Sequence, residues 1–163
     1  MQNLYVAGAG AGSGKSVVVL GFMELLSSLY PKVGFFRPII SHDLAADDLS
    51  NLIRTRYKLP FDPELLYGCS AEQASELVAN GHYRELLKTI LGKYKRLEEE
   101  CDILLCAGTD YDGLVPSLEF DFNIDLANNF GSSIIAVVKG FGRSVDKTLH
   151  ALRMAHESML DRR

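Results

Sequence analysis

The chain has 163 residues, of which 47% are hydrophobic and 23% are charged, and its formal net charge is −4. This length and composition predict one globular domain over residues 1–163 and exclude a disordered or fibrous chain. The acidic charge balance argues against a nucleic-acid partner. No apolar run is long enough to span a membrane, and no secretory signal is readable, so we expect a cytoplasmic protein without a membrane partner.

The first predicted elements are a strand, a glycine-rich loop and a helix. Residues 4–7 form an apolar β run, five glycines lie between residues 8 and 21, and residues 17–30 carry apolar side chains at helical spacing. A second strand is predicted at 33–36. We expect Arg37 and Pro38 to end it, since proline lacks the N–H donor that a β ladder requires.

Helical patterns and short apolar runs alternate through the rest of the chain. Further helices are predicted at 47–57, 72–79, 82–100, 122–130 and 145–160, and further strands at 103–106 and 134–138. This alternation predicts an α/β fold of the three-layer, P-loop NTPase-like kind, with a mainly parallel sheet flanked by helices. The all-apolar run at 134–138 predicts a strand that is covered on both faces.

The helix at 145–160 is the last predicted element. A helix after a parallel strand normally leads into another strand, so we expect the chain to be truncated after this helix, as the N-terminal fragment of a longer enzyme. A natural end, with the last helix capping the sheet, is the alternative. A sheet cut short would expose an edge or an apolar helix face, which predicts a homo-oligomer.

A phosphate-binding loop is predicted between the first strand and the first helix. Its glycines allow backbone N–H groups to turn toward an anion, and the N-terminus of the following helix adds partial positive charge. Lys15 would reach the terminal phosphates, and the Ser16 hydroxyl would ligate a nucleotide-bound Mg²⁺. The predicted anion-binding residues are Gly8, Gly10, Gly12, Ser13, Gly14, Lys15 and Ser16. A purely structural turn is the alternative interpretation.

The loop is one residue longer than the shortest P-loop consensus, because Ala9 stands where the first glycine would be. With this spacing and the segment VGFFRPI at 33–39, the chain resembles the dethiobiotin synthetase family. The segments CDILLCAGTD at 101–110, EFDFN at 119–123 and ANNFG at 127–131 resemble the N-terminal domain of bacterial phosphate acetyltransferases. This second resemblance covers essentially the whole chain. It implies a parent enzyme whose C-terminal catalytic domain, absent here, exchanges acetyl between coenzyme A and phosphate.

The residues that depart from the synthetase pattern bear on catalysis. Gly10 stands where the resemblance implies an aspartate, and Ala107 stands where it implies a glutamate that serves magnesium. Arg37 replaces a substrate-handling lysine; it can still hold an anion through two hydrogen bonds but cannot readily lose its proton. The resemblance implies an aspartate near the metal, which corresponds here to Asp47 or Asp48. Asp110 lies just past the strand at 103–106, where an α/β sheet places its ligands. A solvated or helix-capping carboxylate is the alternative for each.

Three functional hypotheses follow. The leading one is a non-catalytic regulatory or assembly domain of a phosphate acetyltransferase, with a degenerate metal site whose candidate ligands are Ser16, Asp48 and Asp110. It would bind ATP or another nucleotide through the loop and Arg37, with weak or no Mg²⁺ dependence, and has no catalytic residues. The alternatives are an active ATP-dependent ligase of the dethiobiotin synthetase type and an assembly domain with an empty loop. The four histidines and the cysteines Cys69, Cys101 and Cys106 show no metal-ligand or redox spacing.

Overall fold

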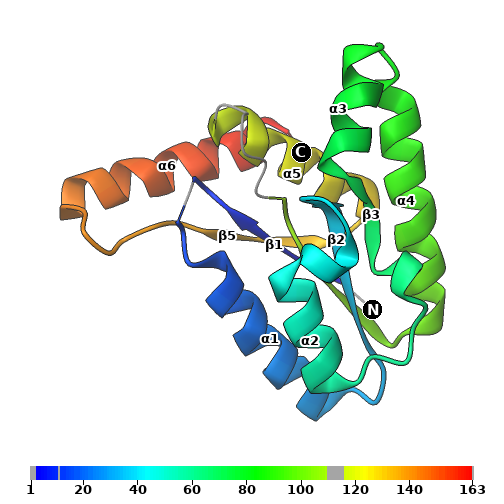
Figure 1. The fold of residues 1–163 in the computed structure, drawn as a ribbon. Coiled ribbons are helices and arrows are strands. Elements are labelled where there is room, and N and C mark those ends of the chain that lie inside the picture. Colours follow the sequence, from blue (N-terminus) through cyan, green and yellow to red (C-terminus); the bar gives the residue numbers. More distant parts are fainter. Residues whose placement is uncertain (1–2, 11, 110–115, 163) are drawn as a thin grey trace.

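The described residues form one five-stranded sheet. The computed structural model describes residues 3–10, 12–109 and 116–162 (Figure 1). The strands are β1 (Leu4–Gly8), β2 (Val33–Ile40), β3 (Tyr67–Ser70), β4 (Ile103–Ala107) and β5 (Ser133–Val137). Their order is β3-β2-β4-β1-β5 and every pairing between neighbours is parallel, as expected for the P-loop NTPase-like fold.

Helices cover both faces of this sheet, so the fold has three layers (Figure 1). Helices α1 (Lys15–Leu29) and α2 (Asp48–Tyr57) lie on one face. On the other face lie α3 (Ala71–Ala79), α4 (Tyr83–Glu100), α5 (Pro116–Phe130) and α6 (Val145–Asp161). Short 3₁₀ turns, η1 (Leu44–Ala46) and η2 (Pro63–Leu65), follow β2 and α2.

The two faces of the sheet carry separate cores because successive strand residues point to opposite sides. In β1, Val6 packs with the helices α1 and α2, whereas Tyr5 and Ala7 pack with α4 and α5. On the Tyr5 side, the rings of Tyr94 and Phe130 stack with centroids 3.8 Å apart. These aromatic rings join α4 and α5 to each other above the sheet.

Strand β2 continues through Arg37 and Pro38, so the prediction that these residues end it is wrong. Arg37 and Ile39 pair with β3, and the Arg37 N–H donates to Leu66 O at 2.9 Å. Alternate residues of a strand serve opposite neighbours, so Pro38 would direct its nitrogen toward β4. The β2–β4 pairing has already ended at Phe36. Pro38 therefore needs no donor at this position.

Strand β3 was missed because its four residues, YGCS, carry no clear apolar alternation. It forms the edge of the sheet beside β2, where Gly68 allows close packing with Pro38 and Ile90. Helix α5 begins six residues before the predicted start at 122. The remaining helices and strands lie within a few residues of their predicted positions.

Strand β5 has packing on both of its faces, as predicted: Ile134 packs against one core and Ile135 against the other. Strand β5 is the other edge of the sheet, and all five of its residues are only partly buried. In α6, Ala155 is buried, but Val145 is 75% exposed and Leu149 is 45% exposed. Apolar residues here do not indicate full burial, since surfaces of folded chains are themselves rich in apolar atoms. Among the described helices, none is long and apolar enough to cross a membrane.

The parallel topology places the ends of β1, β4 and β5 at one edge of the sheet. The glycine-rich loop leaves β1 there, and Gly108 and Val138 follow the neighbouring strands at the same edge. In open α/β sheets this carboxyl edge is where ligands bind. The glycine-rich loop therefore lies at the edge of the sheet where folds of this kind bind their ligands.

Candidate phosphate-binding site

The glycine-rich loop adopts a backbone that side chains would obstruct. Gly10, Gly12 and Gly14 have φ angles of 101°, 65° and 88°, in the left-handed region that favours glycine. Gly14 occupies the N-cap position of α1 and has no side chain that could cap the first N–H groups of the helix. This geometry suits an anion at the N-terminus of α1.

Two serines of the loop occupy different environments. A Cβ atom added at Gly8 would lie 2.6 Å from Ser13 Oγ, so the Ser13 side chain packs closely over Gly8. Ser16 lies in the first turn of α1 and is exposed. Ser13 therefore helps to shape the loop, while Ser16 is open to an incoming ligand.

Lys15 is the buried cation of the site. Its side chain is on the first turn of α1 and only 3% of the residue is exposed. The ammonium group donates a hydrogen bond to the carbonyl oxygen of Gly108, the residue after β4. Burial of an ammonium group requires such partners, because the charged form is poorly solvated inside a protein. The contact holds the Lys15 charge at the carboxyl edge of the sheet.

Asn123 on α5 holds the segment that receives Lys15. Its fully buried amide oxygen accepts hydrogen bonds from Tyr5 Oη at 2.7 Å and from the Thr109 N–H at 2.9 Å. Its amide nitrogen donates to the Glu119 carbonyl at 2.9 Å. A Cβ at Gly108 would collide with the Asn123 oxygen, so only glycine fits there. Sequence reasoning did not identify Asn123 as a site residue, although the segment EFDFN that carried the resemblance contains it.

The loop is also fastened to β5. Gly8 pairs with Val137, and the Ala9 N–H donates to Val137 O at 2.9 Å. Two residues later, Lys139 places its ammonium group 3.6 Å from the position that a Cβ at Gly12 would take. Sequence reasoning missed Lys139 because nothing in the local sequence indicates that the β5–α6 connection returns to the loop.

Arg37, predicted to hold an anion, has an acidic partner in its own chain. Its Nη1 atom lies 2.8 Å from Asp47 Oδ2, and both side chains are buried. Asp47 also caps α2 by accepting the Ser50 N–H at 2.9 Å. Arg37 Nε and Ser50 Oγ are buried without a hydrogen-bond partner among the described residues. The Arg37 charge is thus compensated by Asp47, while its Nε–H group is buried without a partner among the described residues.

The charges of Lys15 and Arg37 both act on the end of β4. Burial raises the pKa of the Cys106 thiol well above its ordinary value, and the two cations oppose this rise. Burial likewise raises the pKa of Tyr5, while Arg37 lowers it. Cys106 and Tyr5 are therefore neutral neighbours of two cations near the carboxyl edge.

The predicted metal ligands are only partly described. Ser16 and Asp48 are exposed in the first turns of α1 and α2, which both begin at the carboxyl edge. Asp110 lies outside the described residues. Ala107, at the position where the resemblance implies a glutamate, is buried in the core on the α1 side. In the described ranges, no three His, Cys, Asp or Glu side chains gather at metal-binding distance.

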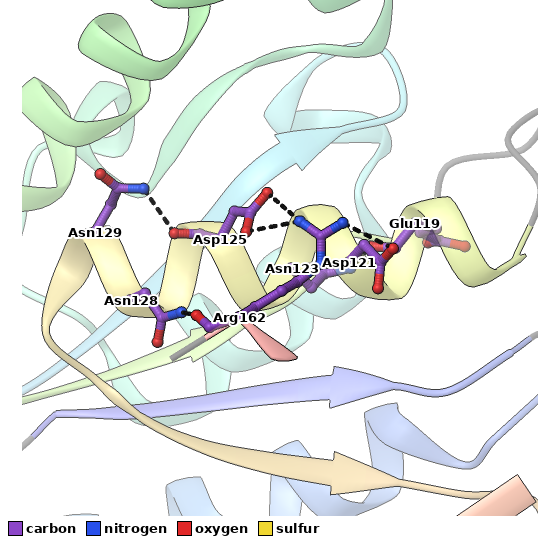
Figure 2. Close-up of polar contacts among 7 residues, drawn as sticks. All are labelled: Glu119, Asp121, Asn123, Asp125, Asn128, Asn129 and Arg162. Carbon is purple, nitrogen blue, oxygen red and sulfur yellow. Dashed lines mark hydrogen bonds and ion pairs between the residues drawn. The ribbon is translucent and has the colours of Figure 1, made fainter. Parts of the chain in front are cut away.

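Helix α5 is fixed to the end of α6 by the side chain of Arg162, as Figure 2 shows. Its guanidinium group contacts both oxygens of Asp125, at 2.8 and 2.9 Å, and Asp121 at 2.9 Å. The Asn128 amide donates to the Arg162 carbonyl at 2.6 Å. Arg162, Asp121 and Asp125 also line an apolar cavity of about 480 Å³ that reaches Ile39. Asn123, which supports the Lys15 site, lies on the same helix.

Comparison with known sequences identifies the family. The sequence model of the AAA domain family matches residues 2–161. Phosphate acetyltransferase from Nitratidesulfovibrio vulgaris is 44% identical over 142 residues, which cover 85% of this chain and 20% of that protein. Phosphate acetyltransferase from Synechocystis sp. is 30% identical over 159 residues, which cover 96% of this chain and 23% of that protein. The ATP-dependent dethiobiotin synthetase from Sulfurovum sp. is 28% identical over 160 residues, which cover 91% of this chain and 74% of that protein.

These matches confirm the resemblance inferred from the sequence, to dethiobiotin synthetases and to phosphate acetyltransferases. The chain spans about a fifth of the length of these two phosphate acetyltransferases. Together with the loop between β1 and α1, the match over residues 2–161 shows that the chain belongs to the AAA domain family of P-loop proteins.

Proposed function

We propose that this chain is a regulatory or assembly domain of a phosphate acetyltransferase, which binds the phosphate groups of a nucleotide without catalysing their transfer. The observation that carries the proposal is Lys15, buried at the carboxyl edge and held there by Gly108 beside a loop of left-handed glycines. Two relatives are named phosphate acetyltransferase. The parent reaction that we propose is the conversion of acetyl-CoA and phosphate into acetyl phosphate and coenzyme A.

Binding is supported by three sources of positive potential at one place. The backbone N–H groups of the loop, the N-terminus of α1 and the Lys15 ammonium group all favour an anion. A nucleotide such as ATP provides that anion. Arg37 would contribute only if N–H donors other than the one that Asp47 accepts face the ligand.

The lack of catalysis is argued from the residues around the loop. Phosphoryl transfer requires a metal ion held beside the phosphates and a positioned nucleophile. Ala107 and Gly10 provide no carboxylate, and Asp47 is engaged with Arg37 and the Ser50 N–H. Ser16 and Asp48 remain as exposed metal ligands on two different helices, with Asp110 as a third candidate. This set favours weak dependence on Mg²⁺.

A second candidate is an active ATP-dependent ligase of the dethiobiotin synthetase type. It is favoured by the match to the Sulfurovum synthetase, which covers 91% of this chain and 74% of that protein. This candidate requires Mg²⁺-dependent turnover of ATP. The first candidate requires binding without turnover, so one set of measurements separates them.

The test is calorimetric titration of the chain with ATP, once with Mg²⁺ and once with a chelator, followed by measurement of phosphate release. The proposal expects similar affinities in both conditions and phosphate release at the background rate. Mg²⁺-dependent hydrolysis would promote the synthetase candidate. No binding of nucleotide, pyrophosphate or phosphate would leave an assembly domain with an empty loop.

We further propose that the partner of this domain is the C-terminal catalytic domain of the parent chain, within a homo-oligomer in the cytoplasm. The exposed apolar side chains of α6 and the β5 edge support a protein contact on this side of the molecule. Light scattering after size-exclusion chromatography, of this chain alone and mixed with the catalytic domain, measures both associations. A monomer that does not bind the catalytic domain would contradict the proposal.

A further inference from the structure

We infer that Lys139, from the β5–α6 connection, supplies a second cation to the anion bound by the loop and selects a ligand with two or more phosphoryl groups. This inference rests on the proposed binding function. It adds a residue that lies more than 120 positions from the loop in the sequence.

The position of Lys139 relative to the loop is fixed by the backbone. The Ala9 N–H donates to Val137 O at 2.9 Å, so the end of β5 and the start of the loop cannot move apart independently. After Lys139 the chain turns sharply: Arg143 N donates to Gly140 O, and Gly142 has a φ of 72°. The lysine thus extends from a short, hydrogen-bonded segment.

The Lys139 ammonium group is available for a ligand. It lies 3.6 Å from the Cβ position of Gly12, over the loop itself, and it makes no hydrogen bond or ion pair with any residue that the structure describes. Residue 139 is only partly exposed. Lys139 has no acidic partner among the described residues, and it lies near the N-terminus of α1, which carries partial positive charge. An anion between these positive groups would relieve their repulsion.

The two lysines approach the loop from opposite sides. Lys15 points to Gly108 after β4, and Lys139 comes from the end of β5, while β4 and β5 are the two neighbours of β1. Two strand spacings of about 4.8 Å each separate β4 from β5. This spacing separates the two backbone positions after β4 and β5 toward which Lys15 points and from which Lys139 extends. A diphosphate or triphosphate chain lying over the loop would contact both ammonium groups.

Affinity measurements test the inference with three probes: inorganic phosphate, pyrophosphate and ATP, each without added metal. We expect Lys139→Ala to weaken pyrophosphate and ATP binding about tenfold, which corresponds to about 1.4 kcal/mol. Phosphate binding should change little, and Lys139→Arg should retain most of the affinity. The matched control is Lys147→Ala, which removes an exposed lysine on the first turn of α6. Equal pyrophosphate affinity in Lys139→Ala and the wild type would overturn the inference and leave the proposed function standing.

Protection from acetylation provides a second readout in the wild-type chain. An amine-acetylating ester should modify Lys139 in the free protein, and ATP or pyrophosphate should slow this modification at least fivefold, as quantified by mass spectrometry. Lys147 should react at the same rate with and without ligand. Unchanged Lys139 reactivity when bound ligand is confirmed by calorimetry would contradict the inference. A wild-type chain that binds none of the three probes would remove the proposed function and this inference with it.

Discussion

The ammonium group of Lys15 donates a hydrogen bond to the carbonyl oxygen of Gly108, joining the start of α1 to the residue that follows β4. Gly108 is in turn followed by Thr109, whose N–H is bound by Asn123 on α5. A loop after the first strand is therefore supported by a strand and a helix from the second half of the chain. Five predictions follow from this arrangement and from the electrostatics of the site.

Loss of the Lys15 charge should abolish most of the stabilisation by nucleotide. ATP at about 100 times its dissociation constant should stabilise the wild type by about 2.7 kcal/mol, which is a melting shift of about 5 to 11 °C for a chain of this size. In Lys15→Ala the backbone N–H groups remain but the ammonium charge is lost. Differential scanning calorimetry with and without ATP measures the shift. A shift as large as in the wild type would show that ATP binds elsewhere.

Magnesium should have little effect on nucleotide affinity in the wild type, because Ala107 and Gly10 provide no carboxylate for the ion. The measurement is the ratio of ATP affinities with Mg²⁺ and with chelator, expected to be below about threefold. Asp48→Ala should leave this ratio unchanged. In Ala107→Glu the ratio should rise, although the new carboxylate would enter a buried core position and a thermal scan must first show that the variant folds. A wild-type ratio above tenfold would contradict the prediction.

Removal of the Asn123 amide should destabilise the fold. Asn123→Ala leaves the buried hydroxyl of Tyr5 and the N–H of Thr109 without their acceptor, at about 1 to 3 kcal/mol each. Urea unfolding followed by circular dichroism should show a loss of about 2 to 6 kcal/mol. Asn129→Ala is the matched control, since this exposed amide bonds only within α5 and its loss should change stability by less than about 0.5 kcal/mol.

Stability should decrease at alkaline pH because of buried thiols. Burial raises the pKa of Cys69 and of Cys101 to about 11, whereas an unfolded cysteine ionises at about 8.5. Between these pH values the folded chain retains protons that the unfolded chain has released, so the free energy of unfolding falls as pH rises from about 8.5 to about 11. Urea titrations across this range should show the decrease. The double variant Cys69→Ala, Cys101→Ala should show a smaller slope, and an identical slope would assign the effect to other groups.

Acetyl transfer should not occur in this chain by itself. The relatives named phosphate acetyltransferase are about five times longer than the part that this chain matches. The described residues include no site for the acetyl chemistry that we can identify. A coupled assay for acetyl phosphate, with acetyl-CoA and phosphate as substrates, should remain at the buffer background. Sustained product formation would show that the chain contains its own catalytic site.

The central strands, the long helices and the phosphate loop could be predicted because each has a strong local pattern. The loop combines a strand, alternating glycines and Gly-Lys-Ser, and the structure places it between β1 and α1 as predicted. Strand β3 could not be predicted, since YGCS is short and its burial depends on β2 and α4. Pro38 was misread for the opposite reason: its local effect is strong, but the neighbouring ladder had already ended.

The supports of the site could not be predicted because they depend on contacts between distant residues. Asn123 is one of several asparagines, and only the fold places its amide beside Thr109 and Tyr5. Lys139 and Asp47 are similar cases: a lysine over Gly12 and an aspartate paired with Arg37 are consequences of strand order and loop path. Local sequence identified the residues of the loop, whereas topology determined which side chains surround it.

The bond between Ala9 and Val137 has a consequence for how the protein is made. The loop leaves the ribosome well before the strand that fastens it, which follows about 130 residues later in the sequence. At roughly 5 to 20 residues per second, the interval is on the order of ten seconds. During that time the nascent loop lacks Val137, and for most of it the loop also lacks Gly108. The capacity to bind phosphate should therefore arise only near the end of translation of this segment, when β5 pairs with β1.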